Sequence, residues 1–341
     1  MKRQNHEVTT AQPLLNAKGN IAEPGWSKRM VQQYRKKDIK APKIRIKEWD
    51  YYYVLGDGFG VAFTLSDEGY AGLQSVSFLD FVNRTEHTES ITDLFPMGRM
   101  HLPEHPDEAD IVYDNGRLSL KYLLELECRH IICNFKNFHG DKDFSCDIRL
   151  EQKDMDHMII ATPWDKKHHF YFNQKTNCMR ADGWVKYGDE EYRFYPERDF
   201  GTLDWGRGVW TYDNTWVWSS GNCDVDGKAF GFNLGYGFGN TTAASENMLF
   251  YDGKAHKLED VFVDMTQKDE NGCWKFTSSD GRFEAVFEPI LDRSAFINLL
   301  IVQSNQHQYF GRMNGTAILD DGTKIEIKDL MCFIENIHNK Y

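Results

Sequence analysis

The chain has 341 residues, of which 41% are hydrophobic and 14% aromatic. This composition supports a large core and excludes a disordered or low-complexity protein. The length exceeds what one core usually holds, so we expect two domains.

The net charge of −12 is unevenly distributed along the chain. Residues 1–47 hold twelve Lys and Arg against three Asp and Glu, which leaves 28 against 49 in the rest of the chain. So acidic a body argues against nucleic-acid binding, because that binding needs cations to displace counterions from phosphate. The basic N-terminal arm, residues 1–44, either docks on this acidic body or contacts an anionic surface.

The cysteines and the hydrophobic runs predict a cytoplasmic protein. Seven cysteines are an odd number, and none forms a CxxC pair, which favours a reduced compartment. The first residues, MKRQNHEVTTAQ, lack the apolar stretch of a signal peptide. The longest apolar run, Phe296–Val302, is seven residues long and predicts no transmembrane segment. The oligomeric state is left open.

In chain order, the patterns predict many strands and little helix. Residues 26–37 are expected to form a short basic helix and 88–95 another helical turn or two. The expected strands are 46–55, 59–65, 72–81, 117–125, 129–135, 144–151, 168–174, 184–194, 214–220, 228–236 and 295–303, with further alternation after Asp280 and Asp321. Nine Asp-Gly or Asn-Gly dipeptides supply residues that accept positive φ, which two-residue hairpin turns require.

This pattern indicates an all-β protein of antiparallel strands rather than a βαβ sheet. About sixteen strands would close a barrel too wide for side chains to fill, so we expect two barrel-like halves in tandem, each an antiparallel barrel or a half-open sandwich, after a short N-terminal arm. We place the first β-domain at 45–175 and the second at 176–341, with the boundary loosely between 155 and 185.

Cofactor and metal motifs are missing from the sequence. There is no phosphate-binding loop and no GxSxG nucleophile elbow, and the glycine-rich stretches 56–60 and 235–239 fit hairpins or bulges. His101 and His105 flank a Leu-Pro-Glu sequence, whose proline opposes a helix that would present both rings together. We expect no cofactor and no metal.

The segment 199–220 holds four of the nine tryptophans beside charged groups. Its candidate ligand-binding residues are Trp205, Arg207, Trp210, Trp216 and Trp218, and its candidate catalytic residue is Asp204. A carboxyl group walled by indole rings is desolvated, so its pKa rises and it can act as a general acid. The alternative is a structural ion pair of Asp204 with Arg207 or Arg198, which would lower that pKa. Gly206 leaves room for a ligand to approach the backbone.

Two further regions carry candidate site residues. In the expected strand 46–55, Glu48 and Asp50 share one face, while Trp49, Tyr51 and Tyr53 share the other. Asp50 is a second catalytic candidate, and Trp49 a ligand-binding one.

The C-terminal third adds His307 and Arg312 as ligand-binding candidates and Glu335 as a catalytic one. A strong β-pattern is interrupted by Gln306, His307, Gln308 and Arg312, so these polar residues either line a barrel mouth or form a solvated loop.

Four long stretches resemble the bacterial DUF2804 family: IKEWDYYYV (46–54), GTLDWGRGVWTYDNTWVW (201–218), HQYFGRMNGTAILDDGT (307–323) and IENIHNKY (334–341). The match covers nearly the whole chain, including GWS at 25–27, but the family name implies no function. More distantly the chain is similar to a lipocalin-like group of carotenoid 1,2-hydratases, AttH-like proteins, tocopherol cyclases and fungal Diels–Alderases. That resemblance implies two tandem calycin-type β-barrels and a lipophilic ligand.

The hydratases of that group carry Asp-His-x-Trp-Gly followed by Trp-x-Trp. Here Asp204-Trp205-Gly206 precedes Trp216-Val217-Trp218, without the His and one spacer residue. We therefore expect an enzyme that hydrates, isomerises or cyclises a hydrophobic or polycyclic small molecule, with Asp204 as the general acid. The alternatives are a non-catalytic lipid or isoprenoid carrier and a carbohydrate-active enzyme that uses paired carboxylates.

Overall fold

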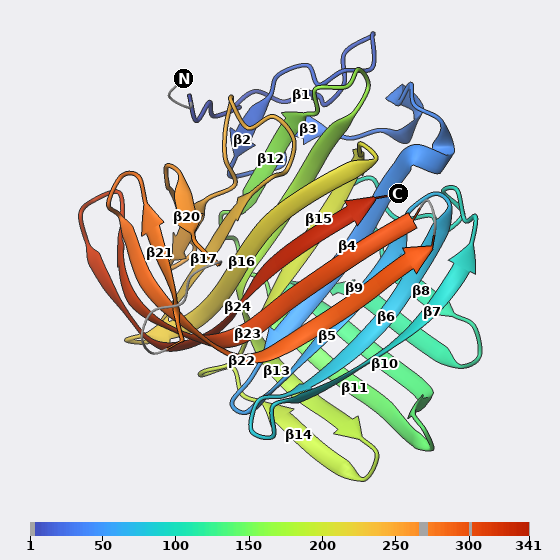
Figure 1. The fold of residues 1–341 in the computed structure, drawn as a ribbon, viewed down its shortest axis with the longest axis vertical. Coiled ribbons are helices and arrows are strands. Elements are labelled where there is room, and N and C mark those ends of the chain that lie inside the picture. Colours follow the sequence, from blue (N-terminus) through green and yellow to red (C-terminus); the bar gives the residue numbers. More distant parts are fainter. Residues whose placement is uncertain (1–3, 266–271, 300–301, 341) are drawn as a thin grey trace.

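The computed structural model describes residues 4–265, 272–299 and 302–340. These residues form strands and two short 3-10 helices, η1 (Lys36–Asp38) and η2 (Lys43–Arg45), and they hold no α-helix. Two curled antiparallel sheets follow one another along the chain and pack against each other (Figure 1). The predicted all-β fold of two barrel-like halves is thus confirmed.

The first sheet contains thirteen strands, in the order β7-β6-β5-β4-β15-β13-β11-β10-β9-β8, with β12 and β14 paired to β13 and β2 paired to β12. Its strands are β2 (Gly25–Ser27), β4 (Ile46–Leu55), β5 (Phe59–Asp67), β6 (Ala71–Asp80), β7 (Thr85–Leu94), β8 (Ile111–Asp114), β9 (Leu118–Glu125), β10 (Cys128–His139), β11 (Lys142–Glu151), β12 (Met158–Pro163), β13 (Phe170–Tyr187), β14 (Glu190–Phe194) and β15 (Phe200–Val209). A small parallel pair, β1 (Gln12–Pro13) and β3 (Gln32–Gln33), lies in the N-terminal arm.

The second sheet contains nine strands, in the order β19-β18-β17-β16-β24-β23-β22-β21-β20. They are β16 (Asp213–Val225), β17 (Lys228–Tyr236), β18 (Met248–Tyr251), β19 (Lys254–Lys257), β20 (Val261–Val263), β21 (Trp274–Ser278), β22 (Phe283–Leu299), β23 (Val302–Ile318) and β24 (Lys324–Lys340). The long strands β22–β24 cross β4–β6 of the first sheet in Figure 1. Contacts across this crossing include Arg293 Nη1 donating to Ser77 Oγ at 2.9 Å.

Three hydrophobic cores result from strand alternation. Each curled sheet encloses a core of its own, and a third core lies between the sheets. Strand β4 shows the division: Tyr52 and Val54 belong to the first core, whereas Tyr51 and Tyr53 belong to the inter-sheet core. The predicted separation of the two faces of residues 46–55 is therefore confirmed.

A β-bulge in β13 links the sheets beside the candidate site. The register of β13 against β15 shifts between Thr176 and Met179, and Cys178 has a φ of 63°. The bulge lets the Cys178 backbone N–H donate to Asn222 Oδ1 at 2.9 Å and Asn177 Nδ2 donate to Ser220 Oγ at 2.9 Å. These two bonds, of which the one from Asn177 is buried, cross from the first sheet to the second, so they help to fix how the two faces meet.

The N-terminal arm docks on the acidic body through ion pairs. Arg29 lies 2.6 Å from Asp154, and Lys36 lies 2.8 Å from Glu48. The predicted helix at 26–37 is wrong, because these residues pair as β2 and β3 and then turn into η1. The predicted helical turns at 88–95 are wrong as well, because β7 pairs with β6 over its whole length.

Most of the Asp-Gly and Asn-Gly dipeptides mark hairpin turns, as predicted, but two lie inside strands. Gly183 and Gly315 occur where a neighbouring backbone approaches closely, since an added Cβ would lie 2.1 Å from Asp147 O and 2.2 Å from Glu284 O respectively. Asn271 lies outside the described residues. The expected strand 295–303 spans the end of β22 and the start of β23, and residues 300–301 lie outside the described part.

The chain changes sheets between β15, which ends at Val209, and β16, which begins at Asp213. The division at 175/176 falls inside β13, a strand of the first sheet. The division of the chain into folding domains at 44/45 and 175/176 stays a prediction.

Candidate functional site

Charged side chains meet between the two sheets, in the middle of the aromatic inter-sheet core. We define the inter-sheet cluster as Lys175 on β13, Asp204 on β15, Trp218 on β16, Glu335 on β24, and Glu246, which precedes β18. All five side chains are buried. Since a buried charge is costly unless it is paired, the partners of each group decide what the cluster can do.

Lys175 and Asp204 form a buried ion pair, with 2.8 Å between Nζ and Oδ2. Asn173 Nδ2 donates to the other carboxylate oxygen, Oδ1, at 2.6 Å. The Lys175 ammonium also lies 3.7 Å from the centroid of the Trp218 ring, a cation–π distance. Both oxygens of Asp204 therefore accept bonds, so its partner is Lys175 rather than Arg207 or Arg198.

Glu335 occupies an apolar row of β24, between Phe333 and Ile337 of the inter-sheet core. Its Oε1 accepts a hydrogen bond from Trp216 Nε1 at 2.7 Å, and its Oε2 accepts one from Gln308 Nε2 at 3.3 Å. Burial raises the pKa of Glu335 from 4.5 to about 7, against the smaller lowering effects of Trp216 and Lys175. A carboxyl group with this pKa can donate and accept protons near neutral pH.

Glu246 is a second carboxyl group with a raised pKa. Burial raises its pKa from 4.5 to about 7, while nearby Lys175 acts in the opposite direction. The Tyr171 hydroxyl donates to Glu246 Oε2 at 3.3 Å, and Oε1 has no hydrogen-bond partner among the described residues. Gly235 leaves the space for Oε1, since an added Cβ would lie 2.1 Å from it.

The residues in and beside the cluster differ slightly in exposure. Asp204 is 7% exposed, Glu335 and Tyr51 are each 8% exposed, and Trp216 is 9% exposed. Lys175 is 1% exposed and Glu246 2%. Lys175 and Glu246 are therefore the more deeply buried of the four charged groups of the cluster.

Trp210 and Trp49 pack as core at the edge of this region. Trp210 contacts Trp49, Trp164 and Trp216 at ring-centroid distances of 5.2–5.6 Å. The Trp49 indole lies over Gly206, where an added Cβ would lie 2.0 Å from Trp49 Cζ2. The space that Gly206 provides is thus filled by Trp49, not left for a ligand.

The core inside the first curled sheet holds three of the candidate residues, Asp50, Trp205 and Arg207. Arg207 Nη2 donates to Asp50 Oδ2 at 2.9 Å, and the guanidinium carbon lies 4.3 Å from the centroid of Trp205. Arg207 also donates to the carbonyl oxygens of Pro103 and Trp49. Burial raises the pKa of Asp50, and Arg207 opposes this. The structure does not bring these residues to Asp204, because neighbouring residues of β15 point to opposite faces.

His307 and Arg312 lie away from the inter-sheet cluster. His307 Nδ1 lies 2.8 Å from Asp292 Oδ2, and its ring stacks on Tyr309 with 5.5 Å between centroids. Arg312 Nη1 lies 3.4 Å from Asp329 Oδ2. The neighbour of His307 on β23, Gln308, is the residue that faces Glu335.

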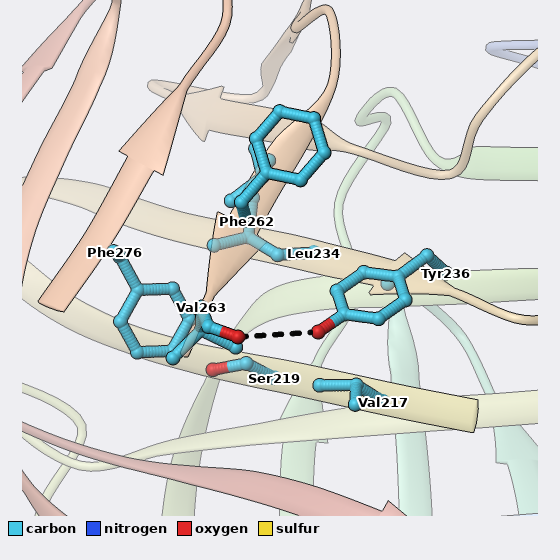
Figure 2. A pocket seen from close by; sticks show the side chains of 9 residues that line it. Val217, Ser219, Leu234, Tyr236, Phe262, Val263 and Phe276 are labelled. Atoms are coloured by element: carbon cyan, nitrogen blue, oxygen red, sulfur yellow. Dashed lines mark hydrogen bonds between the residues drawn. The ribbon is translucent and has the colours of Figure 1, made fainter. Parts of the chain in front are cut away.

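An apolar hollow lies in the second curled sheet, away from the charged groups (Figure 2). It is lined by Val217, Ser219, Leu234, Gly235, Tyr236, Val261, Phe262, Val263 and Phe276. The Tyr236 hydroxyl donates to Val263 O at 3.5 Å across it. Its free space, about 10 Å³, is at most that of a single water molecule.

Sequence reasoning missed Lys175, Asn173, Tyr171 and Glu246, and it named Gln308 only as one of the polar residues of 306–312. A signal existed for the first three, because Tyr171, Asn173 and Lys175 alternate with Phe170, Phe172 and Gln174 along one buried strand. Such a polar face on a continuously buried stretch of strand, residues 170–179, indicates a site between layers. Glu246 precedes a strand in a loop without periodicity, so only the fold could place it.

Among the described residues, no group of three or more His, Cys, Asp and Glu side chains is arranged to hold a metal ion. The described part of the chain also contains no helix long and apolar enough to cross a membrane.

The fold is shared with a solved structure of an AttH-type protein from Nitrosomonas europaea, with a TM-score of 0.52 and 10% sequence identity over 89% of this chain and 96% of that chain. Kievitone hydratase from Nectria haematococca gives a TM-score of 0.46 and 10% identity over 100% of this chain and 97% of that chain. No curated protein matches the chain in sequence. The model of the family described as a domain of unknown function, DUF2804, matches residues 5–341, and the chain therefore belongs to the DUF2804 family.

Proposed function

We propose that this protein is an enzyme that uses acid–base catalysis to hydrate, isomerise or cyclise a lipophilic small molecule between its two sheets, with Glu335 as the proton donor. The observation that carries the proposal is the setting of Glu335. It is a carboxyl group with a pKa raised to about 7, on a residue that is 8% exposed, and the Trp216 indole holds it in an apolar row. A general acid with a pKa near the working pH is the most effective.

Proton donation is assigned to Glu335 rather than to Asp204 in this proposal, because Asp204 is ion-paired with the Lys175 ammonium, whereas Glu335 accepts hydrogen bonds from the neutral side chains of Trp216 and Gln308. Lys175 and Asn173 donate to its two oxygens, an arrangement suited to the ionised carboxylate. Asp204 then provides a fixed negative charge beside a developing carbocation. One face of Trp218 is covered by Lys175, which leaves Trp216 as the indole beside Glu335.

For hydration, the protons and bonds balance without a further reactant. Glu335 transfers its proton to one alkene carbon, and the C=C π electrons form the new C–H bond. Water adds to the resulting carbocation through oxygen and returns a proton to the Glu335 carboxylate. The aromatic walls of the inter-sheet core suit a lipophilic substrate, because such sites are largely apolar with a few oriented polar groups.

The carrier and the carbohydrate hypotheses stay predictions. The depth of Asp204 favours an enzyme over a carrier, since a carrier needs no buried titratable group. The hollow in the second curled sheet is too small for a lipid, which gives the carrier hypothesis no support there.

The test is to incubate the protein with a lipid-soluble extract of the producing cells in D₂O and to follow every compound by mass spectrometry. The parent chain is compared with Glu335→Gln and with Glu326→Gln, a control on the same strand whose carboxylate is exposed and paired with Lys328. We expect at least one apolar compound to be converted, with deuterium uptake, by the parent and the control only. Conversion of no compound, or equal conversion by Glu335→Gln, would overturn the proposal.

A further inference from the structure

The N-terminal residues Gln4–Val8 lie between the first sheet and the loop that carries Glu246. The Val8 backbone N–H donates to Trp26 O at 2.7 Å, and the Trp26 N–H donates to His6 O at 3.0 Å. On the other side, the His6 N–H donates to Ala243 O at 2.8 Å. Since Trp26 belongs to β2, which pairs with β12, backbone hydrogen bonds run continuously from the first sheet to this loop.

Asn5 is the residue of this segment that fixes the loop through its side chain. Asn5 Oδ1 accepts the Ser245 backbone N–H at 3.3 Å, and Asn5 Nδ2 donates to Glu259 Oε2 at 3.2 Å. Its carbonyl oxygen accepts Trp26 Nε1 at 2.9 Å. Asn5 has a φ of 44°, a left-handed conformation that asparagine tolerates better than most residues.

The next residue after Ser245 is Glu246, so the bond from Asn5 acts one residue away from a carboxyl group of the inter-sheet cluster. Lys257 Nζ adds further bonds to the same loop, to Ser245 Oγ at 3.0 Å and to Asn247 O at 2.8 Å. Within the described part of the chain, the carboxyl group itself accepts the 3.3 Å bond from Tyr171, and its other oxygen has no partner. Its position therefore depends on the loop backbone more than on its own contacts.

We propose that the N-terminal segment is a positioning element of the site: Asn5 fixes the loop 242–246 so that Glu246 stays between the sheets as a second acid–base group. This inference rests on the proposed function. In an isomerisation, Glu335 gives its proton to one carbon of the substrate while ionised Glu246 takes a proton from another. The substrate keeps its composition, and exchange with water restores both carboxyl groups.

The charged and titratable groups around Glu246 come from three strands of the two sheets: Tyr171 and Lys175 on β13, Asp204 on β15, and Lys257 on β19. Lys175 and Lys257 lower the pKa of Glu246, Asp204 raises it, and burial raises it most. A loop that loosens admits water and removes part of the burial effect. The pKa of Glu246 should then fall, which a loss of overall stability alone would not cause.

The test uses the full chain and needs no substrate. Asn5→Gly removes the side chain and keeps the positive φ without strain. In the double variant Asn5→Asp with Glu259→Gln, the side chain at position 259 donates the hydrogen bond and the side chain at position 5 accepts it. The new aspartate also keeps an oxygen that accepts the Ser245 N–H. Glu7→Ala is the control, because Glu7 is an exposed neighbour in the same segment.

Two quantities are measured: hydrogen–deuterium exchange of peptides covering 240–247, and infrared titration of the protonated carboxyl band that Glu246→Gln abolishes. We expect Asn5→Gly to speed exchange about tenfold, since it removes two partly buried hydrogen bonds that together contribute roughly 1.4 kcal/mol, and to lower the pKa of Glu246. The double variant should restore both, and Glu7→Ala should change neither. Unchanged exchange, or faster exchange without a pKa shift, would overturn the positioning role. If Asn5→Gly shows the expected changes in exchange and pKa but the parent chain converts no compound in the extract, the positioning role stands and the proposed function alone is contradicted.

Discussion

The Lys175 ammonium lies between the Asp204 carboxylate, 2.8 Å from Oδ2, and the face of Trp218, 3.7 Å from the ring centroid. Lys175 and Asp204 are register partners on the adjacent strands β13 and β15, whereas Trp218 belongs to the second sheet. The contact therefore joins the sheets through a buried cation. Because both charges are desolvated, each depends on the other.

Lys175→Met should lower the free energy of unfolding by about 3–5 kcal/mol, because the Asp204 carboxylate would remain buried without its counter-charge. The double variant Lys175→Met with Asp204→Leu should recover most of this loss, since it leaves no buried charge unpaired. Urea unfolding of the parent and both variants checks this prediction. A single variant within 1 kcal/mol of the parent would show that water already solvates the pair.

Gly206→Ala should be destabilising by about 1–3 kcal/mol, because the added Cβ would overlap the Trp49 indole. The overlap is severe, with Cζ2 only 2.0 Å from the Cβ position. Combining it with Trp49→Leu should make the cost of the added methyl group much smaller. Thermal unfolding of the parent chain, the two single variants and the double variant gives the coupling free energy between positions 49 and 206. Additive effects would mean that Trp49 does not lie over Gly206.

Stability should fall as the pH rises through the range in which Glu335 ionises in the folded state. Its pKa is raised from 4.5 to about 7, so between these values the folded chain keeps a proton that the unfolded chain has lost. The stability that protonated Glu335 contributes is fully present below about pH 4.5 and is lost by about pH 7. Glu335→Gln should remove this slope, worth roughly 3 kcal/mol, from chemical unfolding curves measured at a series of pH values. An unaltered slope would show that Glu335 is ionised at low pH.

His157 should produce the opposite dependence on pH. Burial lowers the pKa of His157 from 6.5 to about 4, so below pH 6.5 the unfolded chain binds a proton that the folded chain refuses. The stability that neutral His157 contributes is fully present above about pH 6.5 and is lost as the pH falls to about 4. His157→Gln, which can still bond to Thr176 Oγ1, should remove roughly 3 kcal/mol of this acid sensitivity. If the variant loses as much stability at low pH as the parent does, other groups cause that loss.

The fold could be predicted from the sequence because turn dipeptides and period-two alternation are local signals. Strand β4 begins and ends where the pattern 46–55 places it. The helical expectation for 88–95 failed because β7 is an edge strand with polar residues on both faces, so its pairing with β6 leaves little hydrophobic pattern.

The candidate site could be predicted only in part. Asp204, Trp216, Trp218 and Glu335 do meet between the sheets, whereas Trp205 and Arg207 do not. Applying strand alternation to residues 200–209 would have separated Arg207 from Asp204, since they are three residues apart and so point to opposite faces. Glu246 could not be found, because its position depends on contacts with Asn5, 240 residues away from Ser245.

The most direct test of the central claim is native mass spectrometry of the parent chain and of Glu335→Gln, each purified from its own cells, with the released ligand identified. Without its proton donor the variant should retain a lipophilic substrate. The parent should hold the product or nothing, and the two molecules should differ by one water for a hydration or be isomers for the other reactions. The same ligand in equal amount on both chains would contradict catalysis by Glu335, and a water-soluble sugar on either chain would contradict the lipophilic substrate.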